Sequence, residues 1–210
     1  MATGERCIVM ILADCTGHGV PGAFMSMIGN ELLNQIVTVM GCYAPDLILE
    51  KLDEGIRYAL QQTTSGNRDG MDVAVCSIFP ERGKAYFAGA ARPLCYVQGN
   101  QLKMLAGTRR GLGGQQYGKR QIAFQEHEII LDQPTKFYLF SDGYPDQFGG
   151  KQGRKLTTKQ FVAQLAKGID LPMSEQQTQL LQMLHDWKGD QRQIDDILVF
   201  GISLNGSGTH

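Results

Sequence analysis

Ala13-Asp14-Cys15-Thr16-Gly17-His18-Gly19 is the stretch from which the fold of this chain can be argued. It follows an apolar run, Cys7–Leu12, and precedes an apolar-periodic segment that opens at Val20-Pro21-Gly22. The pattern predicts a strand, a glycine-rich turn with an aspartate, and a helix. Because glycines let a ligand approach the main chain, the turn is a candidate site for a metal ion or a phosphate group. The alternative is a structural turn in which Asp14 and Thr16 cap local amides.

Aspartates also stand at the ends of three other apolar runs. They are Asp142 after Phe137–Ser141, Asp72 before Val73–Val75, and Asp195 and Asp196 before Ile197–Phe200. In an antiparallel sheet the carboxyl end of one strand lies beside the amino end of its neighbour, so we expect Asp14, Asp142 and Asp195 to converge. Grouped carboxylates repel unless cations hold them, and such hard oxygen ligands suit Mg²⁺ or Mn²⁺ rather than zinc. For any single aspartate, the alternative is a turn or cap residue.

Three segments in order carry a family resemblance. They are Ala-Asp-Cys-Thr-Gly-His-Gly-Val-Pro-Gly-Ala-Phe-Met-Ser (13–26), Phe-Ser-Asp-Gly (140–143) and Asp-Asp-Ile-Leu-Val-Phe (195–200). They resemble the signature segments of the SpoIIE branch of the metal-dependent (PPM) serine/threonine protein phosphatases. With Ala-Gly-Ala-Ala-Arg-Pro-Leu (88–94), the resemblance covers nearly the whole chain. It implies an α+β fold, a four-layer α-β-β-α sandwich of antiparallel sheets flanked by helices, with a metal site at one end of the sheets.

The resemblance also implies a set of site residues. Asp14 would bridge two Mn²⁺ or Mg²⁺ ions, the carbonyl oxygen of Cys15 would help to bind one, and Asp142 and Asp195 would complete the ligands. The implied reaction is hydrolysis of phosphoserine or phosphothreonine by a water that the ions activate, without a covalent intermediate. His18 is a candidate for protonating the leaving serine oxygen, with a structural role as the alternative. Asp196 is expected to be a neighbour of the ligands.

The resemblance further implies bacterial partner switching. The substrate would be a phosphorylated protein similar to an anti-sigma-factor antagonist, and an N-terminal sensor domain would control the enzyme. Family members have a strand pair with another acid upstream, whereas only Met1–Arg6 precede the first strand here. We therefore expect residues 1–204 to be a phosphatase domain without its N-terminal strands and 205–210 to be a tail. An exposed sheet edge would favour a homodimer.

Two other function classes stay open. One is a catalytically weak regulatory module that binds a phosphorylated partner or a sensor domain. The other is a two-metal phosphodiesterase or nuclease, which the lack of a basic groove pattern disfavours. A second departure from the family pattern, Tyr144–Gln147 after the Asp-Gly pair, would change the flap or the substrate contacts.

Composition excludes several other classes. The 210 residues have a formal net charge of −1, with 20 basic and 21 acidic side chains, so neither nucleic acid nor an acidic membrane surface is an expected partner. The apolar stretch Ile8–Ala13 is far too short to span a bilayer, and no signal peptide is visible. We expect a cytoplasmic protein, or the cytosolic domain of a membrane-anchored sensor. Five cysteines without paired spacing indicate reduced thiols rather than disulfides or a zinc site.

Periodicity predicts the remaining elements. The expected helices are 22–40, one beginning near Pro45, 158–167, and 174–188 with Ser174 and Gln177 as a capping box. The expected strands are 73–79, 84–88, 94–97, 101–105, 121–131, 136–141 and 197–204. Residues 107–118 are expected to be a loop in which Arg109 or Arg110 could face a phosphate. Residues 149–153 are expected to be an exposed loop or flap, and Met25 and Met27 to be core residues. Separate blocks of strands and helices favour an α+β domain.

Overall fold

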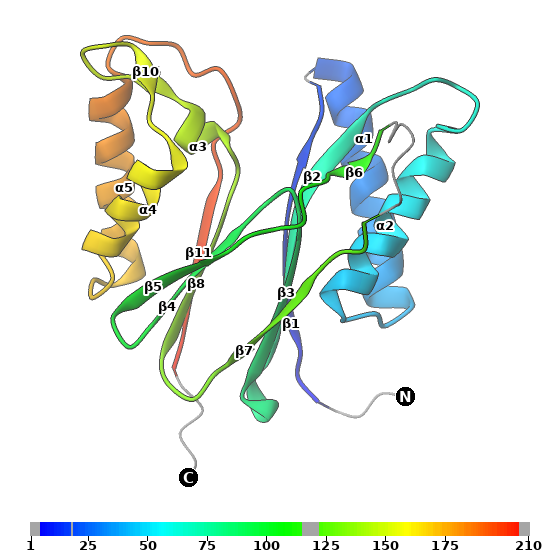
Figure 1. Cartoon of the computed structure of the whole chain (residues 1–210), viewed down its shortest axis with the longest axis horizontal. Coiled ribbons are helices and arrows are strands. Elements are labelled where there is room, and N and C mark those ends of the chain that lie inside the picture. The colour runs from blue at the N-terminus through cyan, green and yellow to red at the C-terminus, as the bar shows by residue number, and fades with distance from the viewer. Residues whose placement is uncertain (1–4, 18, 115–121, 206–210) are drawn as a thin grey trace. The chain divides into compact units, whose positions relative to one another are not determined.

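The computed structural model describes residues 5–17, 19–114 and 122–205, which form two compact units (Figure 1). The first comprises the described residues up to Pro93 and within Leu105–Leu131. The second comprises Leu94–Met104 and the described residues from Asp132 onward. Each unit contains an antiparallel sheet and helices, so the mixed α+β class expected from the sequence is confirmed.

The first unit is built on a sheet with the order β1-β2-β3-β7. Its strands are β1 (Ile8–Cys15), β2 (Gly70–Phe79), β3 (Lys84–Ala90) and β7 (Glu126–Ile130), and the short β6 (Leu112–Gly113) pairs with the start of β2. Its helices are α1 (Gly19–Leu33), the π-helical continuation η1 (Asn34–Val39), α2 (Pro45–Ala59) and the short η2 (Pro80–Arg82). β1 pairs with β2 along its whole length, which fixes the position of the aspartate at its end.

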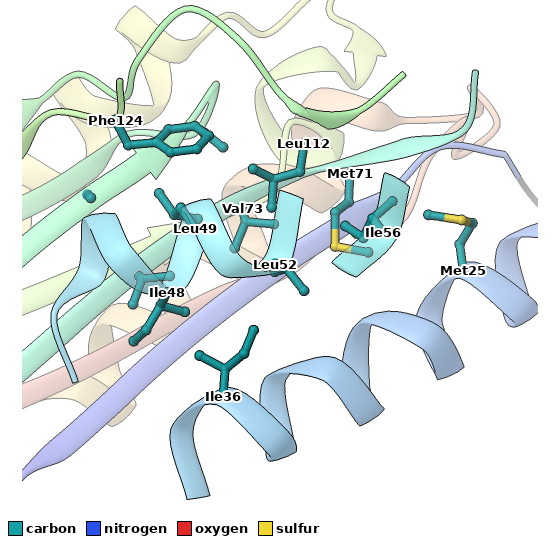
Figure 2. Packing of buried hydrophobic residues seen from close by; sticks show 13 residues of the cluster. Met25, Ile36, Ile48, Leu49, Leu52, Ile56, Met71, Val73, Leu112 and Phe124 are labelled. Carbon is teal, nitrogen blue, oxygen red and sulfur yellow. The ribbon is translucent and has the colours of Figure 1, made fainter. Parts of the chain in front are cut away.

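The core of the first unit lies between its helices and its sheet (Figure 2). Apolar residues three or four apart place one face of α2 against β2, and all of these residues are fully buried: Ile48, Leu49, Leu52 and Ile56. Gly55 allows α1 to approach α2, because a Cβ there would lie 2.8 Å from Cδ2 of Leu32. Met25 is in the core as predicted, but the prediction for Met27 is wrong, since that residue is 69% exposed.

Several predicted boundaries in this unit differ from the structure; β2, for example, begins at Gly70, so Asp72 lies within the strand and not before it. The first helix begins at Gly19, before the predicted Gly22, and Gly22 packs tightly against the carbonyl of Gly17. The last strand starts at Glu126, so the predicted start near residue 121 is wrong for the described residues 122–125. Phe124 instead enters the core, where packing outweighs the alternating pattern of its segment.

The second unit has a sheet with the order β11-β8-β4-β5. These strands are β11 (Val199–Leu204), β8 (Thr135–Phe140), β4 (Leu94–Gln98) and β5 (Gln101–Leu105). The helices are α3 (Gly143–Asp146), α4 (Thr158–Lys167) and α5 (Met173–Lys188), and β9 (Phe148–Gly149) pairs with β10 (Arg154–Lys155). Phe161 of α4 packs against Phe140 and Tyr144, which ties the helices to β8 and to the turn after it.

One prediction in the second unit is confirmed and one needs correction. The expected exposed loop or flap at 149–153 is the turn of the β9–β10 hairpin, where residues 150–153 are exposed and Gly149 packs against the carbonyl of Trp187. The expected capping box is wrong: α5 begins at Met173 after Pro172, and no side chain caps its amino end. Pro172 has an extended backbone, with a ψ of 151°, so the helix starts at Met173 and Ser174 lies within the first turn instead of at the cap position.

Among the helices of the described ranges, none is long and apolar enough to cross a membrane.

Candidate metal and phosphate site

The first half of the site lies where β1 and β2 meet. Asp14 stands directly opposite Asp72 in the strand register, so two carboxylates share one position of the ladder. Thr16 holds this end of the pair, since its amide donates to the carbonyl of Gly70 at 2.9 Å and its hydroxyl accepts from the Gly70 amide at 2.8 Å. Like charges directly opposite each other destabilise a strand pair unless a cation lies between them.

Arg92 supplies that cation. Its Nη2 lies 2.7 Å from Oδ2 of Asp14 and 3.6 Å from Oδ2 of Asp72, and its side chain is only 10% exposed. The residue is placed by the turn after β3, where Ala91 has a φ of 59° and donates its amide to the carbonyl of Thr108 at 2.8 Å. The sequence pattern by itself does not assign a role to Arg92. The available signal was an arginine within an otherwise apolar run between two strands.

A glycine packs against the second carboxylate. A Cβ on Gly111 would lie 2.6 Å from Oδ1 of Asp72, so the backbone of this segment lies close to that side chain. The neighbouring Arg110 does not face a phosphate as suggested, because its side chain is 7% exposed, pairs with Asp53 and stacks on the Phe124 ring. Arg109 is exposed.

The second unit carries the other predicted ligands. Asp142 is separated from the end of β8 by Ser141 alone, and Asp195 and Asp196 precede β11, which pairs antiparallel with β8. The Ser141 hydroxyl donates to the carbonyl of Asp196 at 2.8 Å and accepts from the amide of Leu198 at 3.0 Å. The antiparallel pairing thus brings these aspartates to the same end of two neighbouring strands, as expected from the sequence.

The backbone at Gly143 lies close to the backbone at Asp196. A Cβ on Gly143 would lie 2.2 Å from the carbonyl oxygen of Asp196, so only glycine fits beside that carbonyl. Asp142 stands at the start of α3, and its own carbonyl accepts from the amide of Asp146 at 2.8 Å. The turn after β8 is therefore held by main-chain contacts on both sides of Asp142.

The structure thus places Asp14 and Cys15 in the first unit and Asp142 and Asp195 in the second. Convergence of all three aspartates stays a prediction, and His18 lies outside the described residues. The Cys15 thiol is half-buried and accepts from the Ser26 hydroxyl at 3.7 Å, and burial raises its pKa, so the thiol is neutral near pH 7. All five cysteines have free thiols.

The chemical type of the oxygen ligands at this position suits a divalent cation. Asp14 and Asp72 offer hard carboxylate oxygens whose mutual repulsion a cation relieves, and Arg92 already acts as a cation at this position. No group of three or more histidine, cysteine, aspartate or glutamate side chains that could hold a metal occurs among the residues the structure describes.

Comparisons with known proteins give a consistent result. The profile of a family described as Stage II sporulation protein E (SpoIIE) matches residues 4–205. The SiaA-PP2C domain of Pseudomonas aeruginosa aligns over 96% of this chain and 81% of that chain, with a TM-score of 0.83 and 27% identity. The structure of the RsbU and RsbW domains of Rv1364c from Mycobacterium tuberculosis aligns over 98% and 54%, with a TM-score of 0.73 and 18% identity.

A third similar structure is RsbX in complex with magnesium, with a TM-score of 0.59 and 15% identity over 97% of this chain and 83% of that chain. At 15% and 18% identity, the likeness shows the fold alone. Among curated protein sequences, no significant match was found.

Proposed function

Because this chain belongs to the SpoIIE family and has the fold of PP2C-type phosphatase domains, we propose that it is a metal-dependent serine/threonine protein phosphatase. The observation that carries the proposal is the pair Asp14–Asp72 with the Arg92 guanidinium beside both carboxylates. An acidic pair suits divalent cations, and a buried guanidinium suits a phosphoryl group. The two together match the chemistry of phosphate ester hydrolysis.

Two Mn²⁺ or Mg²⁺ ions would be held by Asp14, the carbonyl oxygen of Cys15, Asp142 and Asp195. When bound, such ions activate a water and neutralise charge on the phosphoryl oxygens. The similar RsbX was solved in complex with magnesium, which supports this choice of cation. Asp14 and Asp142 are the residues on which the proposal depends most, and His18 remains the proposed proton donor to the leaving oxygen.

Arg92 would bind the phosphoryl group. Its guanidinium now pairs with Asp14 and is largely enclosed by protein. With divalent cations held by the carboxylates, the attraction between the guanidinium and Asp14 would be weaker. A planar guanidinium can then donate two parallel hydrogen bonds to phosphoryl oxygens, as arginine does in phosphate sites.

The proposed substrate is phosphoserine or phosphothreonine on a small regulatory protein, similar to an anti-sigma-factor antagonist. In Rv1364c, RsbU and RsbW domains were solved together, which supports a place in partner-switching signalling. We propose residues 1–204 as the phosphatase domain, controlled by an N-terminal sensor domain. β1 and β11 are outer strands of the described sheets, so edge pairing in a homodimer is part of the proposal.

The test is phosphate release from a phosphoserine peptide by the full chain, with and without Mn²⁺. We expect turnover that depends on Mn²⁺ and is lost in Asp14→Asn and in Asp142→Asn. Asp190→Asn is the matched control, because Asp190 is exposed after α5 and makes the same charge change. Circular dichroism checks that each variant is folded.

Two results would contradict the proposal: no Mn²⁺-dependent turnover by the native chain, or full activity in both ligand variants. Binding of the phosphopeptide without turnover, measured by calorimetry, would instead support the regulatory module.

A further inference from the structure

We propose that Asp53, a buried carboxylate of α2, is a positioning residue for the Asp14–Asp72–Arg92 site. It would act by holding residues 107–114, here called the strap, against Asp72 and the turn that carries Arg92. The consequence for metal binding and turnover depends on the proposed function, whereas the placement of the strap does not.

Asp53 is completely buried, and within the described ranges three donors to its carboxylate can be named. Its Oδ1 accepts from the Gly113 amide at 2.7 Å and from Nε of Arg57 at 3.1 Å, and its Oδ2 accepts from Nη1 of Arg110 at 2.9 Å. Two of these donors, Gly113 and Arg110, belong to the strap. One carboxylate of α2 thus holds the strap at two positions.

The arginines of this cluster make further contacts that fix the strap. Arg57 donates to the carbonyls of Gly114 at 2.9 Å and Gly113 at 3.2 Å. Arg110 donates from Nε to the carbonyl of Ile122 at 2.7 Å, and its guanidinium carbon lies 3.8 Å from the centre of the Phe124 ring. Hydrogen bonds to charged groups in a buried cluster are stronger than neutral ones, so the cluster resists displacement.

Packing adds to the ionic contacts. Leu112, between the two strap residues that bind Asp53, is 2% exposed and belongs to the same core as Ile56 of α2 (Figure 2). Phe124, on which Arg110 stacks, is also in this core. The strap is therefore fixed to α2 by both charge and apolar contact.

The other side of the strap contacts the site. A Cβ on Gly107 would lie 2.4 Å from the carbonyl oxygen of Arg92, and the amide of Thr108 donates to the carbonyl of Gly89 at 2.7 Å. Gly111 lies against Asp72, where a Cβ would be 2.6 Å from Oδ1. At Gly107 and Thr108 both partners are backbone, so no flexible side chain absorbs a shift of the strap there. At Gly111 the partner is the Asp72 carboxylate itself, so a shift of the strap would act directly on that side chain. A displacement of a few tenths of an ångström would reach Asp72 and the Arg92 turn.

The first test needs neither metal nor substrate. In the metal-free full chain, the side-chain NMR signals of Arg92 report its pairing with Asp14. We expect these Arg92 signals to shift or broaden in Asp53→Asn, which keeps the size of the side chain but removes its charge. Glu54→Gln is the matched control, because Glu54 is the next residue of α2, is exposed, and loses the same charge.

A second variant covers the case in which Asp53→Asn does not fold. Gly111→Ala leaves the ionic cluster intact and places a methyl group against Asp72. It should shift the Arg92 signals as well, since Arg92 faces both carboxylates. Arg92 signals that coincide with those of the native chain in Gly111→Ala, or in a folded Asp53→Asn, would overturn the inference.

The second test measures Mn²⁺ affinity by calorimetry and turnover of a phosphoserine peptide. Groups that orient metal ligands typically change affinity by about 10- to 100-fold, so we expect weaker Mn²⁺ binding of this size in Asp53→Asn. A residue with a purely structural role would lower the unfolding temperature and leave the affinity of the folded protein unchanged, and that result would also overturn the inference. If the native chain neither binds Mn²⁺ nor turns over, the proposed function fails, and the NMR comparison still decides the positioning role.

Discussion

Nη2 of Arg92 lies 2.7 Å from Oδ2 of Asp14, across 78 positions of sequence. Asp14 is the penultimate residue of β1 and Arg92 follows β3, and β2 lies between these two strands in the sheet. The turn after β3 returns toward β2, where Val73 pairs with Ala91 in an isolated bridge. A candidate metal ligand and a candidate phosphate ligand are thus brought into contact by the order of the strands.

Replacing Arg92 should lower phosphopeptide turnover without weakening Mn²⁺ binding. In Arg92→Met, we expect phosphopeptide turnover to fall by about 100-fold, the scale seen when one donor to a developing charge is removed. Mn²⁺ affinity should be equal or higher, because the guanidinium no longer competes for Asp14. Steady-state kinetics and calorimetry measure the two effects, with exposed Arg82→Met as the control. Unchanged turnover would mean that Arg92 only balances charge.

Gly143→Ala should destabilise the second unit. Its Cβ would overlap the backbone of Asp196, at 2.2 Å from the carbonyl oxygen, and backbone cannot move as easily as a side chain. Overpacking of this kind costs about 1–3 kcal/mol, which urea unfolding can measure. In Gly201→Ala, in β11 of the same unit, the nearest atom to the new Cβ is a side-chain carbon of Tyr138 at 3.3 Å, so we expect a smaller loss. Equal losses in the two variants would contradict the contact.

Leu52→Ala tests the core beneath α2. Leu52 is fully buried, so the change leaves a cavity, and we expect the free energy of unfolding to fall by about 2–5 kcal/mol. Leu47→Ala on the same helix removes the same atoms from a residue that is 45% exposed, and it should cost much less. Urea unfolding of both variants gives the comparison. A small loss for Leu52→Ala would show that this core collapses around the cavity.

Because the Cys95 thiol is buried, we expect the protein to lose stability at high pH. Burial raises the pKa of its thiol from 9.0 to about 12, so the folded chain holds this proton more tightly than the unfolded chain. The stability from this difference is complete below pH 9 and is lost as pH rises toward 12. Between those values, the stability of the native chain relative to Cys95→Ala should fall by up to about 1.4 kcal/mol per pH unit. Urea unfolding at several pH values measures this, and parallel curves would contradict it.

Local sequence pattern predicted most elements of both units. Apolar residues at helical spacing marked α2, and runs broken by turns such as Glu81-Arg82-Gly83 marked β2 and β3, because these signals depend only on neighbouring residues. The errors fall where distant contacts compete with local pattern. Phe124 was predicted to lie in a strand but is a core residue outside the strands. Arg110 was a candidate phosphate ligand but forms a buried ion pair with Asp53.

The residues of the candidate site also fall into those that the sequence indicated and those that only the structure revealed. The sequence alone identified Asp14, Asp142 and Asp195 at strand ends, since a carboxylate beside a glycine or at a strand boundary is visible in the chain itself. Only the tertiary structure decided that Asp72 stands opposite Asp14, that Arg92 lies beside both, and that Asp53 holds the strap. These three facts depend on strand register and on the packing of α2, which contacts between residues far apart in the chain determine.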